Sequence, residues 1–287
     1  MRRLYYLSLL PALAVMLSSC ISNTSTAVPT TSTKTSLPSP APVLQTSTPL
    51  PEPTQTATLR PPATLDPEQA TETIAAMLRG LEDCPVPCFF GIVPSKTTVG
   101  EAKNDFSHLG LQVWHNLQDN KEFYGADDKM ASGLSISVSL TIENVIVKNI
   151  AVGINTEPYH AGVSRQWSAF SPESLISRYG PPSRVDLFLG RVDPTPTHAM
   201  VLYFDAVNLI VEYTGTKLLS DGPGLEICPL TNDVDFLRVW MGSDPQYPPT
   251  VGVPLEKATS LTLGQFSKLM TGRPDQACFK LNEAAFP

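Results

Sequence analysis

The chain is poor in charge, and the charge that it has is mostly acidic. Only 16% of its 287 residues are Asp, Glu, Lys or Arg, and the formal net charge is −7. The first nineteen residues contain Arg2 and Arg3 and no acid, so their removal would make the remaining chain more acidic. Nucleic acids and anionic lipid surfaces both attract a basic field. We therefore expect no nucleic-acid partner, and we expect any attachment to a membrane to be covalent.

The sequence also lacks the residue patterns of common active sites. Its histidines are scattered, and no His-Glu-x-x-His pattern occurs. There is no Gly-x-Ser-x-Gly elbow for a serine hydrolase and no glycine-rich dinucleotide loop. We therefore expect no catalytic residue, no metal site and no cofactor, and we expect that the protein is not an enzyme.

The apolar run at the amino terminus is too short to span a bilayer comfortably. It covers residues 4–17, follows the basic pair Arg2 and Arg3, and precedes small residues, as in a secretory leader. Residues 17–20 read Leu-Ser-Ser-Cys and resemble the bacterial lipobox. The alternatives are an ordinary secretory signal with a coincidental cysteine and a short uncleaved anchor.

The lipobox resemblance implies that residues 1–19 are a signal peptide and that Cys20 carries diacylglycerol. Two or three acyl chains anchor a protein stably, whereas one chain binds only marginally. The expected location is therefore the cell membrane, with the protein lipid-anchored on the extracytoplasmic face and held in the bilayer through acylated Cys20.

The segment after Cys20 is expected to be a disordered stalk. Residues 20–66 are dominated by Thr, Ser and Pro and contain no aromatic residue. Such a segment cannot bury enough apolar surface to offset the entropy of ordering it. Its prolines favour an extended, solvated backbone, so the stalk would lift the folded region away from the lipid.

The folded region shows helix signals followed by strand signals. Asp66 and Pro67 begin an apolar helical stripe whose core face includes Met77 and Leu78. Thr98 with Glu101 forms the pattern of a second helix start. The clearest strand signal alternates apolar residues with Ser and Thr over residues 134–142. A turn near Glu143 would return the chain along residues 145–154, with Ile146, Ile150, Val152 and Ile154 on one face if the loop holds three residues.

This organisation recurs along the chain. A helix start at Ser171 precedes strand-like residues 184–189, 199–204 and 209–213, and a partial copy has a strand at residues 236–240 and a cap at Thr262. We predict the α+β class, built from tandem short-helix and antiparallel-sheet units over residues 67–160, 161–226 and 227–287.

Two stretches carry family resemblances. Residues 171–185, a helix that ends in Tyr-Gly-Pro-Pro-Ser-Arg-Val before a strand, resemble the lipoprotein modules of the SmpA/OmlA (BamE) type and the repeats of β-lactamase-inhibitor-protein-like proteins. Residues 84–98 are similar to the opening of uncharacterised exported bacterial lipoproteins. The first resemblance implies a protein-binding or assembly module without catalysis, and the second implies no known activity.

Four cysteines remain besides Cys20: Cys84, Cys88, Cys228 and Cys278. An even number in an exported chain indicates two disulfides, and three pairings are possible. The spacing favours Cys84–Cys88 with Cys228–Cys278. A structural zinc site fits the spacing less well, because the cysteines do not form two Cys-x-x-Cys pairs. A redox-active dithiol also fits less well, because three residues rather than two separate Cys84 from Cys88.

The remaining candidates concern binding. Tyr247, Pro248 and Pro249 lie in a proline-rich loop that is a candidate partner contact. The function expected is a non-catalytic module that binds or assembles with another envelope or extracellular protein. The alternatives are a small-ligand-binding lipoprotein and a hydrolase of wall or extracellular polymer. Six aromatic residues are candidates for a ligand groove, although strand aromatics more often pack in a core: Trp114, Trp167, Tyr203, Phe204, Tyr213 and Trp240.

Overall fold

A computed structural model describes the folded part of the chain. The described residues are 63–80, 84–118, 121–129, 134–156, 167–192, 195–215, 225–229, 234–243, 252–273 and 277–286. The chain separates into two units, residues 1–57 and 58–287, and every described residue belongs to the second. The signal peptide, Cys20 and nearly all of the predicted stalk lie outside the described residues. No helix in the described ranges is long and apolar enough to span a membrane.

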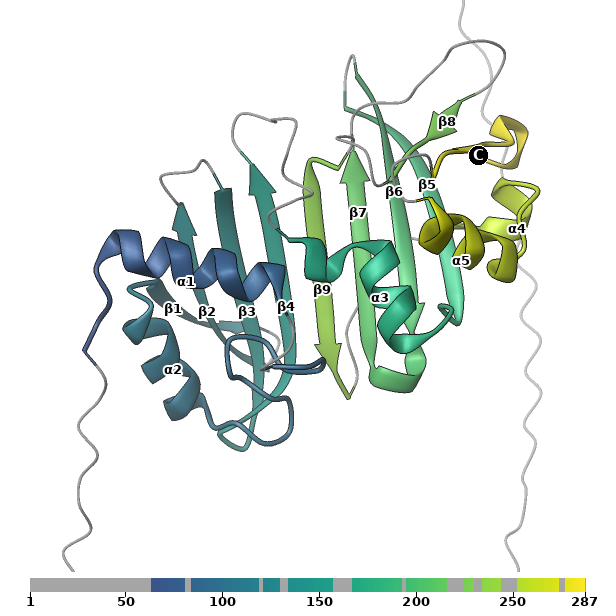
Figure 1. The fold of residues 1–287 in the computed structure, drawn as a ribbon. Coiled ribbons are helices and arrows are strands. Elements are labelled where there is room, and N and C mark those ends of the chain that lie inside the picture. The colour runs from purple at the N-terminus through teal and green to yellow at the C-terminus, as the bar shows by residue number, and fades with distance from the viewer. Residues whose placement is uncertain are drawn as a thin grey trace, which may run out of the picture. The chain divides into compact units, whose positions relative to one another are not determined.

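The described unit is built on a nine-stranded antiparallel sheet (Figure 1). The strand order is β1-β2-β3-β4-β9-β7-β6-β5-β10, and β8 pairs separately with β11. Together with the helices, this sheet confirms the α+β class. The strands are β1 (Gln112–Gln118), β2 (Lys121–Lys129), β3 (Leu134–Glu143), β4 (Ile146–Thr156), β5 (Arg184–Val192), β6 (Thr195–Phe204), β7 (Leu209–Gly215), β8 (Glu226–Ile227), β9 (Phe236–Gly242), β10 (Val253–Pro254) and β11 (Phe279–Lys280).

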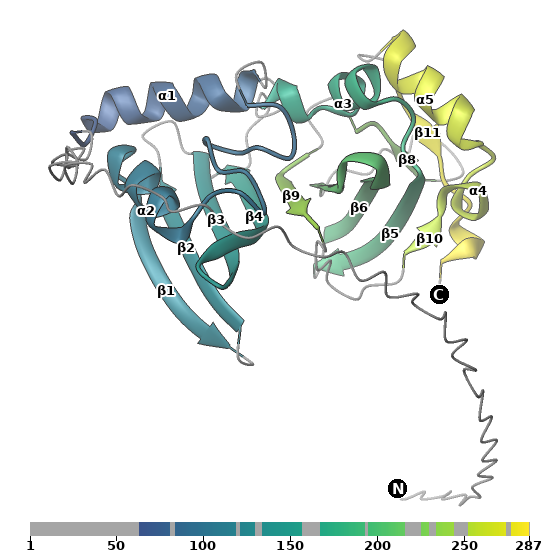
Figure 2. The same ribbon diagram turned by 90° about the horizontal axis from the view of Figure 1, so that it is seen from below.

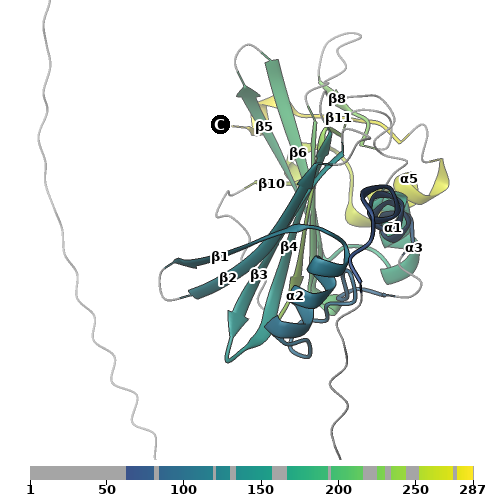
Figure 3. The ribbon, with the colours of Figure 1, turned by 90° about the vertical axis from the view of Figure 1, so that its left-hand side faces the viewer.

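The longer helices cover one face of this sheet. Figures 2 and 3 show α1, α2, α3 and α5 on the same side of the strands. We call the opposite side of the sheet the open face. The helices are α1 (Pro67–Arg79), α2 (Val99–His108), α3 (Pro172–Tyr179), α4 (Leu255–Ala258) and α5 (Leu263–Gly272), with short 3-10 turns η2 (Ser168–Phe170), η3 (Asp205–Val207) and η5 (Glu283–Ala285).

Apart from the short edge strand β10, the sheet consists of two four-stranded meanders. Strands β1 to β4 follow one another in the first, and β5, β6, β7 and β9 follow one another in the second. The last strands of the two meanders, β4 and β9, pair antiparallel at the centre of the sheet, with Val152 opposite Val239. The strand expected at residues 236–240 in the C-terminal unit is therefore the last strand of the second meander.

The predicted alternation in β3 explains why one face of the sheet packs against helices. Ile136, Val138 and Leu140 are buried in the core beneath the helices, whereas Ser137 on the open face is exposed. Because neighbouring residues of a strand point to opposite faces, the Ser/Ile pattern gives β3 one apolar and one polar side. Burial of each large aliphatic side chain stabilises the fold by roughly 1.5–3 kcal/mol.

The turn between β3 and β4 differs from the expected three-residue loop. Two residues form it, Asn144 and Val145, and both have positive φ, at 50° and 61°. The register then shifts between Thr141 and Ile142, and Val147 is buried in place of Ile146. This irregularity restores the predicted core face for the rest of β4, because a bulge adds the residue that the short turn omits.

The predicted helix starts are present. Thr98 begins α2 and Thr262 begins α5, and each forms a capping box with the residue three positions on, Glu101 or Gln265. Asp66 caps α1 by accepting hydrogen bonds from the backbone of the first turn. Since the first amides of a helix have no partner within it, each cap contributes about 1 kcal/mol.

Two disulfides join the four cysteines in the pairing that the spacing favoured. Cys84 bonds to Cys88 across a Cα–Cα distance of 5.1 Å, and Cys228 bonds to Cys278 across 4.1 Å. The second bond lies beside the pair β8 and β11 and closes the C-terminal segment onto the chain that precedes β9. It closes a much longer loop than the first, with a sequence separation of 50 rather than 4.

We expect the two disulfides to differ in their contribution to stability. In the chain-entropy model, Cys228→Ser with Cys278→Ser lowers the free energy of unfolding by about 4 kcal/mol, and Cys84→Ser with Cys88→Ser lowers it by about 2 kcal/mol. Urea unfolding of the two double variants beside the parent measures both. Equal losses would show that loop length does not govern these bonds.

Candidate functional site

The open face carries a groove across the first meander and into β9. Two hollows, of about 530 and 470 Å³, lie side by side there and share Ser137, Gly153 and Phe236. We call them together the open-face groove. Its further side chains come from five strands of the sheet: Gln112, Trp114, Asp127, Ser135, Ser139, Ala151, Asn155, Arg238 and Trp240.

The floor of the groove is made of small side chains. Ser137 and Ser139 of β3 lie beside Ala151 and Gly153 of β4. A Cβ atom at Gly153 would come within 2.8 Å of the Ser137 hydroxyl, so a larger residue there would disturb the floor. Short side chains on two adjacent central strands leave a trough, because taller side chains stand on the strands to either side.

One wall of the groove is the indole of Trp114. This ring lies over Gly125 of β2, where an added Cβ atom would clash with the ring. Only a glycine leaves room for the indole to lie flat across the sheet at this point. Trp114 is half-buried, so part of the ring remains available to a ligand.

The other wall is formed by β9. The guanidinium of Arg238 stacks over the ring of Phe236 at 4.5 Å, and its Nη1 atom lies 3.6 Å from the Glu212 carboxylate on β7. Arg238 is exposed, whereas Glu212 is buried and also accepts a hydrogen bond from the Thr214 hydroxyl at 2.9 Å. The neighbouring carboxylate therefore fixes a cation that still faces solvent.

The separation of the walls suits an extended or flat ligand. Trp114 lies over β2, and Phe236 belongs to β9, which is three strand spacings or roughly 14 Å away. Between them, the amide oxygen of Asn155 is buried and accepts no hydrogen bond from any described residue. An amide without a partner in a groove is a position at which a ligand donor gains a bond.

Aromatic residues continue the open face beyond the groove. Trp240 packs with Val201, Tyr203 and Ile210 in a buried cluster on the second meander. Arg184 places its guanidinium 3.8 Å from the centre of the Tyr203 ring and 3.2 Å from Asp186. On β5 and β6, the open face therefore contains a second exposed arginine that lies between an aromatic ring and a carboxylate.

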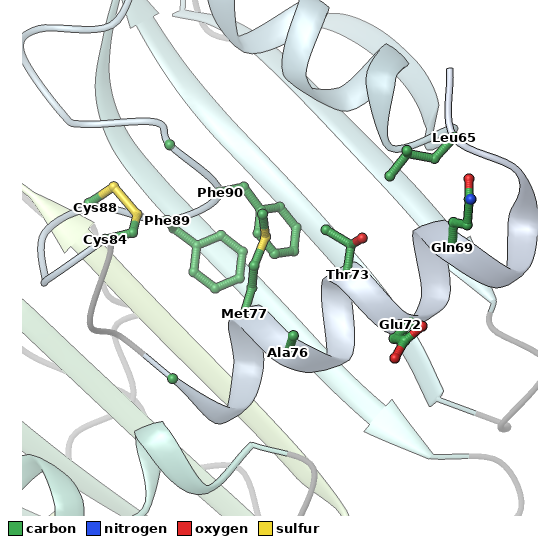
Figure 4. A pocket seen from close by; sticks show the side chains of 12 residues that line it. Leu65, Gln69, Glu72, Thr73, Ala76, Met77, Cys84, Cys88, Phe89 and Phe90 are labelled. Carbon is green, nitrogen blue, oxygen red and sulfur yellow. A yellow bond between two sulfur atoms is a disulfide. The ribbon is translucent and has the colours of Figure 1, made fainter. Parts of the chain in front are cut away.

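A third hollow, separate from the open-face groove, lies between α1 and the loop that follows the first disulfide (Figure 4). It has a volume of about 790 Å³. The rings of Phe89 and Phe90 lie 4.3 Å apart, and Met77 of α1 reaches toward them, with the Cys84–Cys88 bond at one end of the hollow. We call this hollow the α1 pocket. The other side chains that line it are Leu65, Gln69, Glu72, Thr73 and Ala76.

A tight turn explains how two phenylalanines reach the α1 pocket. Phe89 and Ile92 exchange backbone hydrogen bonds of 2.9 Å each, and Phe90 and Gly91 between them have φ angles of 53° and 79°. Such a turn needs positive φ at both central residues, and glycine supplies the second without strain. Met77 is 37% exposed, although its helical position predicted it in the core with Leu78.

The chain before α1 is also held against the folded unit. The backbone amide of Leu65 donates to the carbonyl of His108 at 2.8 Å, and Nδ1 of His108 lies 2.6 Å from the carbonyl oxygen of Ala63. The residues just before Asp66, which the composition assigned to the stalk, therefore contact the end of α2.

The structure separates the sequence-predicted site residues into three groups. Cys20 and the loop residues Tyr247, Pro248 and Pro249 lie outside the described residues. The four other cysteines lie in two disulfides at different places, with Cys84 and Cys88 lining the α1 pocket. Of the six aromatic candidates, one group lies on the open face, Trp114, Tyr203 and Trp240, and the other in the core beneath the helices, Trp167, Phe204 and Tyr213.

Sequence reasoning missed Phe236 and the small residues of the floor. Gly125 and Gly153, each in the interior of a strand, were the available signal, because a strand glycine often marks close approach of another group.

Over the ranges that the structure describes, no three His, Cys, Asp or Glu side chains gather as a metal site would need. Comparison of the chain with protein-family models, with curated proteins and with solved structures found no match.

One titratable group is buried away from the open-face groove and the α1 pocket. His198 of β6 is 3% exposed, and its Nδ1 atom has no hydrogen-bond partner in the described part of the chain. Burial lowers the pKa of His198 from 6.5 to about 4, and the charge of Asp235 opposes this shift. The side chain is therefore neutral at pH 7 and resists protonation in the folded protein.

This buried histidine predicts a loss of stability in weak acid. As pH falls from about 6.5 to about 4, the unfolded chain takes up a proton at residue 198 and the folded chain does not. The contribution of His198 to the free energy of unfolding should therefore decrease across this window by up to about 3 kcal/mol. Urea unfolding at pH 4 to 7 should show a smaller decrease for His198→Met. A His198→Met curve that matched the parent would contradict the assignment.

Proposed function

We propose that the protein is a lipid-anchored, extracytoplasmic lipoprotein whose folded region is a non-catalytic module that binds another envelope or extracellular protein. The open-face groove is the observation that carries this proposal. It combines an aromatic wall on either side, an exposed arginine and a floor of small residues on a rigid sheet.

The composition of the open face supports a protein partner. Residues that dominate protein–protein binding energies are chiefly Trp, Tyr and Arg, and this face presents Trp114, Arg184 and Arg238 beside other rings. Each arginine is already oriented by a carboxylate, so it loses less side-chain entropy on binding. The floor of Ser, Ala and Gly carries no charge that a partner would have to desolvate.

The two-meander topology supports the resemblance to duplicated SmpA/OmlA (BamE)-type and β-lactamase-inhibitor-protein-like units. Each half is a four-stranded meander preceded by a helix that ends at a glycine with positive φ, Gly110 before β1 and Gly180 before β5. The module that we propose would thus be two such units joined through β4 and β9, and the resemblance implies binding or assembly.

The anchor is tested by replacing the proposed acylation site. Cys20→Ser should move most of the protein from the membrane to the soluble extracytoplasmic fraction, because no acyl chain then holds it in the bilayer. Cell fractionation and intact-mass measurement of the full chain check this. Cys84→Ser, which removes a cysteine outside the leader, should leave the protein on the membrane. Retention of Cys20→Ser, with no fatty-acid mass on the parent, would overturn the anchor.

The binding surface is tested by filling the groove. The full chain is captured from native membranes after chemical cross-linking, as the parent and as Ser137→Arg. Ser137 is exposed on the open face, so the substitution should cost little stability while its side chain blocks both hollows. We expect the yield of one specific partner protein to fall by about tenfold, which corresponds to about 1.4 kcal/mol of binding free energy.

The α1 pocket supplies the matched control and the second candidate function. Its apolar lining supports the small-ligand-binding alternative, and Ala76→Arg would fill it from an exposed position on α1. Ala76→Arg should leave capture of the protein partner unchanged. Unchanged capture by Ser137→Arg would overturn the groove. A co-purified small molecule that only Ala76→Arg loses would favour the ligand-binding function instead.

A further inference from the structure

Strand β1 forms an open edge of the sheet. It pairs with β2 on one side, and within the described residues no backbone hydrogen bond joins it to any other segment. Six of its seven residues are exposed, and only Trp114 is half-buried. An edge of this kind presents a row of unpaired backbone donors and acceptors to solvent.

The features that commonly protect an edge strand are missing from β1. Its sequence, Gln-Val-Trp-His-Asn-Leu-Gln, contains no Lys, Arg, Asp, Glu or Pro. Val113 is 41% exposed and Leu117 is 67% exposed, and both stand on the same side of the strand. The opposite edge of the sheet is different, because β5 is covered there by the two-residue strand β10, which contains Pro254.

Strand β1 is complementary to itself. If two copies pair antiparallel about His115, all seven residues find a partner within the strand. Val113 of each copy then faces Leu117 of the other, twice, on the helix side of the sheet. On the open face, Trp114 faces Asn116. On the axis, His115 faces its own copy, and each His115 has a Glu122 carboxylate 3.2 Å away. A shift of two residues in either direction removes both apolar pairs.

We propose that β1 is a self-association edge, through which two copies of this chain join their sheets in an antiparallel, twofold-symmetric dimer. The two sheets become continuous across the axis, with both helix layers on one side and both open-face grooves on the other. The same strand serves both copies, as an isologous interface requires. This inference is independent of the ligand of the groove.

A cysteine on the proposed axis tests the dimer. Opposed residues of an antiparallel pair have Cα atoms about 4.5 or 5.5 Å apart, which a disulfide can span. His115→Cys in the full chain, on membranes and under mild oxidation, should therefore give a covalent dimer on a non-reducing gel. The control Leu117→Cys has a more exposed position, but in this register its two copies lie roughly 14 Å apart. It should form at least fivefold less dimer.

A second variant separates the register from simple proximity. Leu117→Lys, added to His115→Cys, puts a cation against Val113 of the other copy and should reduce the cross-linked dimer about tenfold. Equal dimer from His115→Cys and Leu117→Cys would overturn the proposal, as would no dimer from His115→Cys. Cross-linking of His115→Cys to a different protein in place of its own copy would also overturn it.

Discussion

The antiparallel pairing of β4 with β9 is the constraint on which the rest of the structure depends. Apart, the two strands would each be the edge of a four-stranded sheet, with unpaired backbone groups in the middle of the apolar core. Together they place Val152 opposite Val239 and make one core continuous beneath the helices of both halves. The groove exists only through this pairing, because Trp114 belongs to the first meander and Phe236 to the second.

The face of the sheet beneath the helices stabilises the fold, and the open face carries the groove that we propose for recognition. The helix face is filled with large aliphatic side chains, and its close packing fixes the strand positions. The open face of β3 and β4 contributes little burial, so small side chains such as Ser139, Ala151 and Gly153 cost little stability there. A groove built on paired strands is also held more rigidly than one built on loops, which lowers the entropy that binding must overcome.

Local features of the fold could be predicted from the sequence, and features that depend on long-range pairing could not. The capping boxes at Thr98 and Thr262 and the alternating face of β3 involve residues close in the chain, and the structure contains them. The pairing of β9 with β4 has no local signal, so the groove as a whole could not be predicted, and only the strand glycines Gly125 and Gly153 marked parts of it. Met77 was wrong as a core prediction, because it lines the α1 pocket beside Phe90, and the helical pattern of α1 alone does not show where that loop lies.

The low content of charged residues, from which we expected no nucleic-acid partner, also explains why the open face of the sheet carries mainly uncharged polar side chains. A sheet face that only needs to stay soluble commonly carries Lys and Glu, yet β3 presents Ser and Thr, and β1 presents Gln, Trp and Asn. Such groups are satisfied by water and can exchange it for a partner at a smaller desolvation cost than ions. Two arginines of this face, Arg184 and Arg238, are each paired with a carboxylate. A surface with so few unpaired charges is suited to being covered by a protein partner, because little charge has to be desolvated.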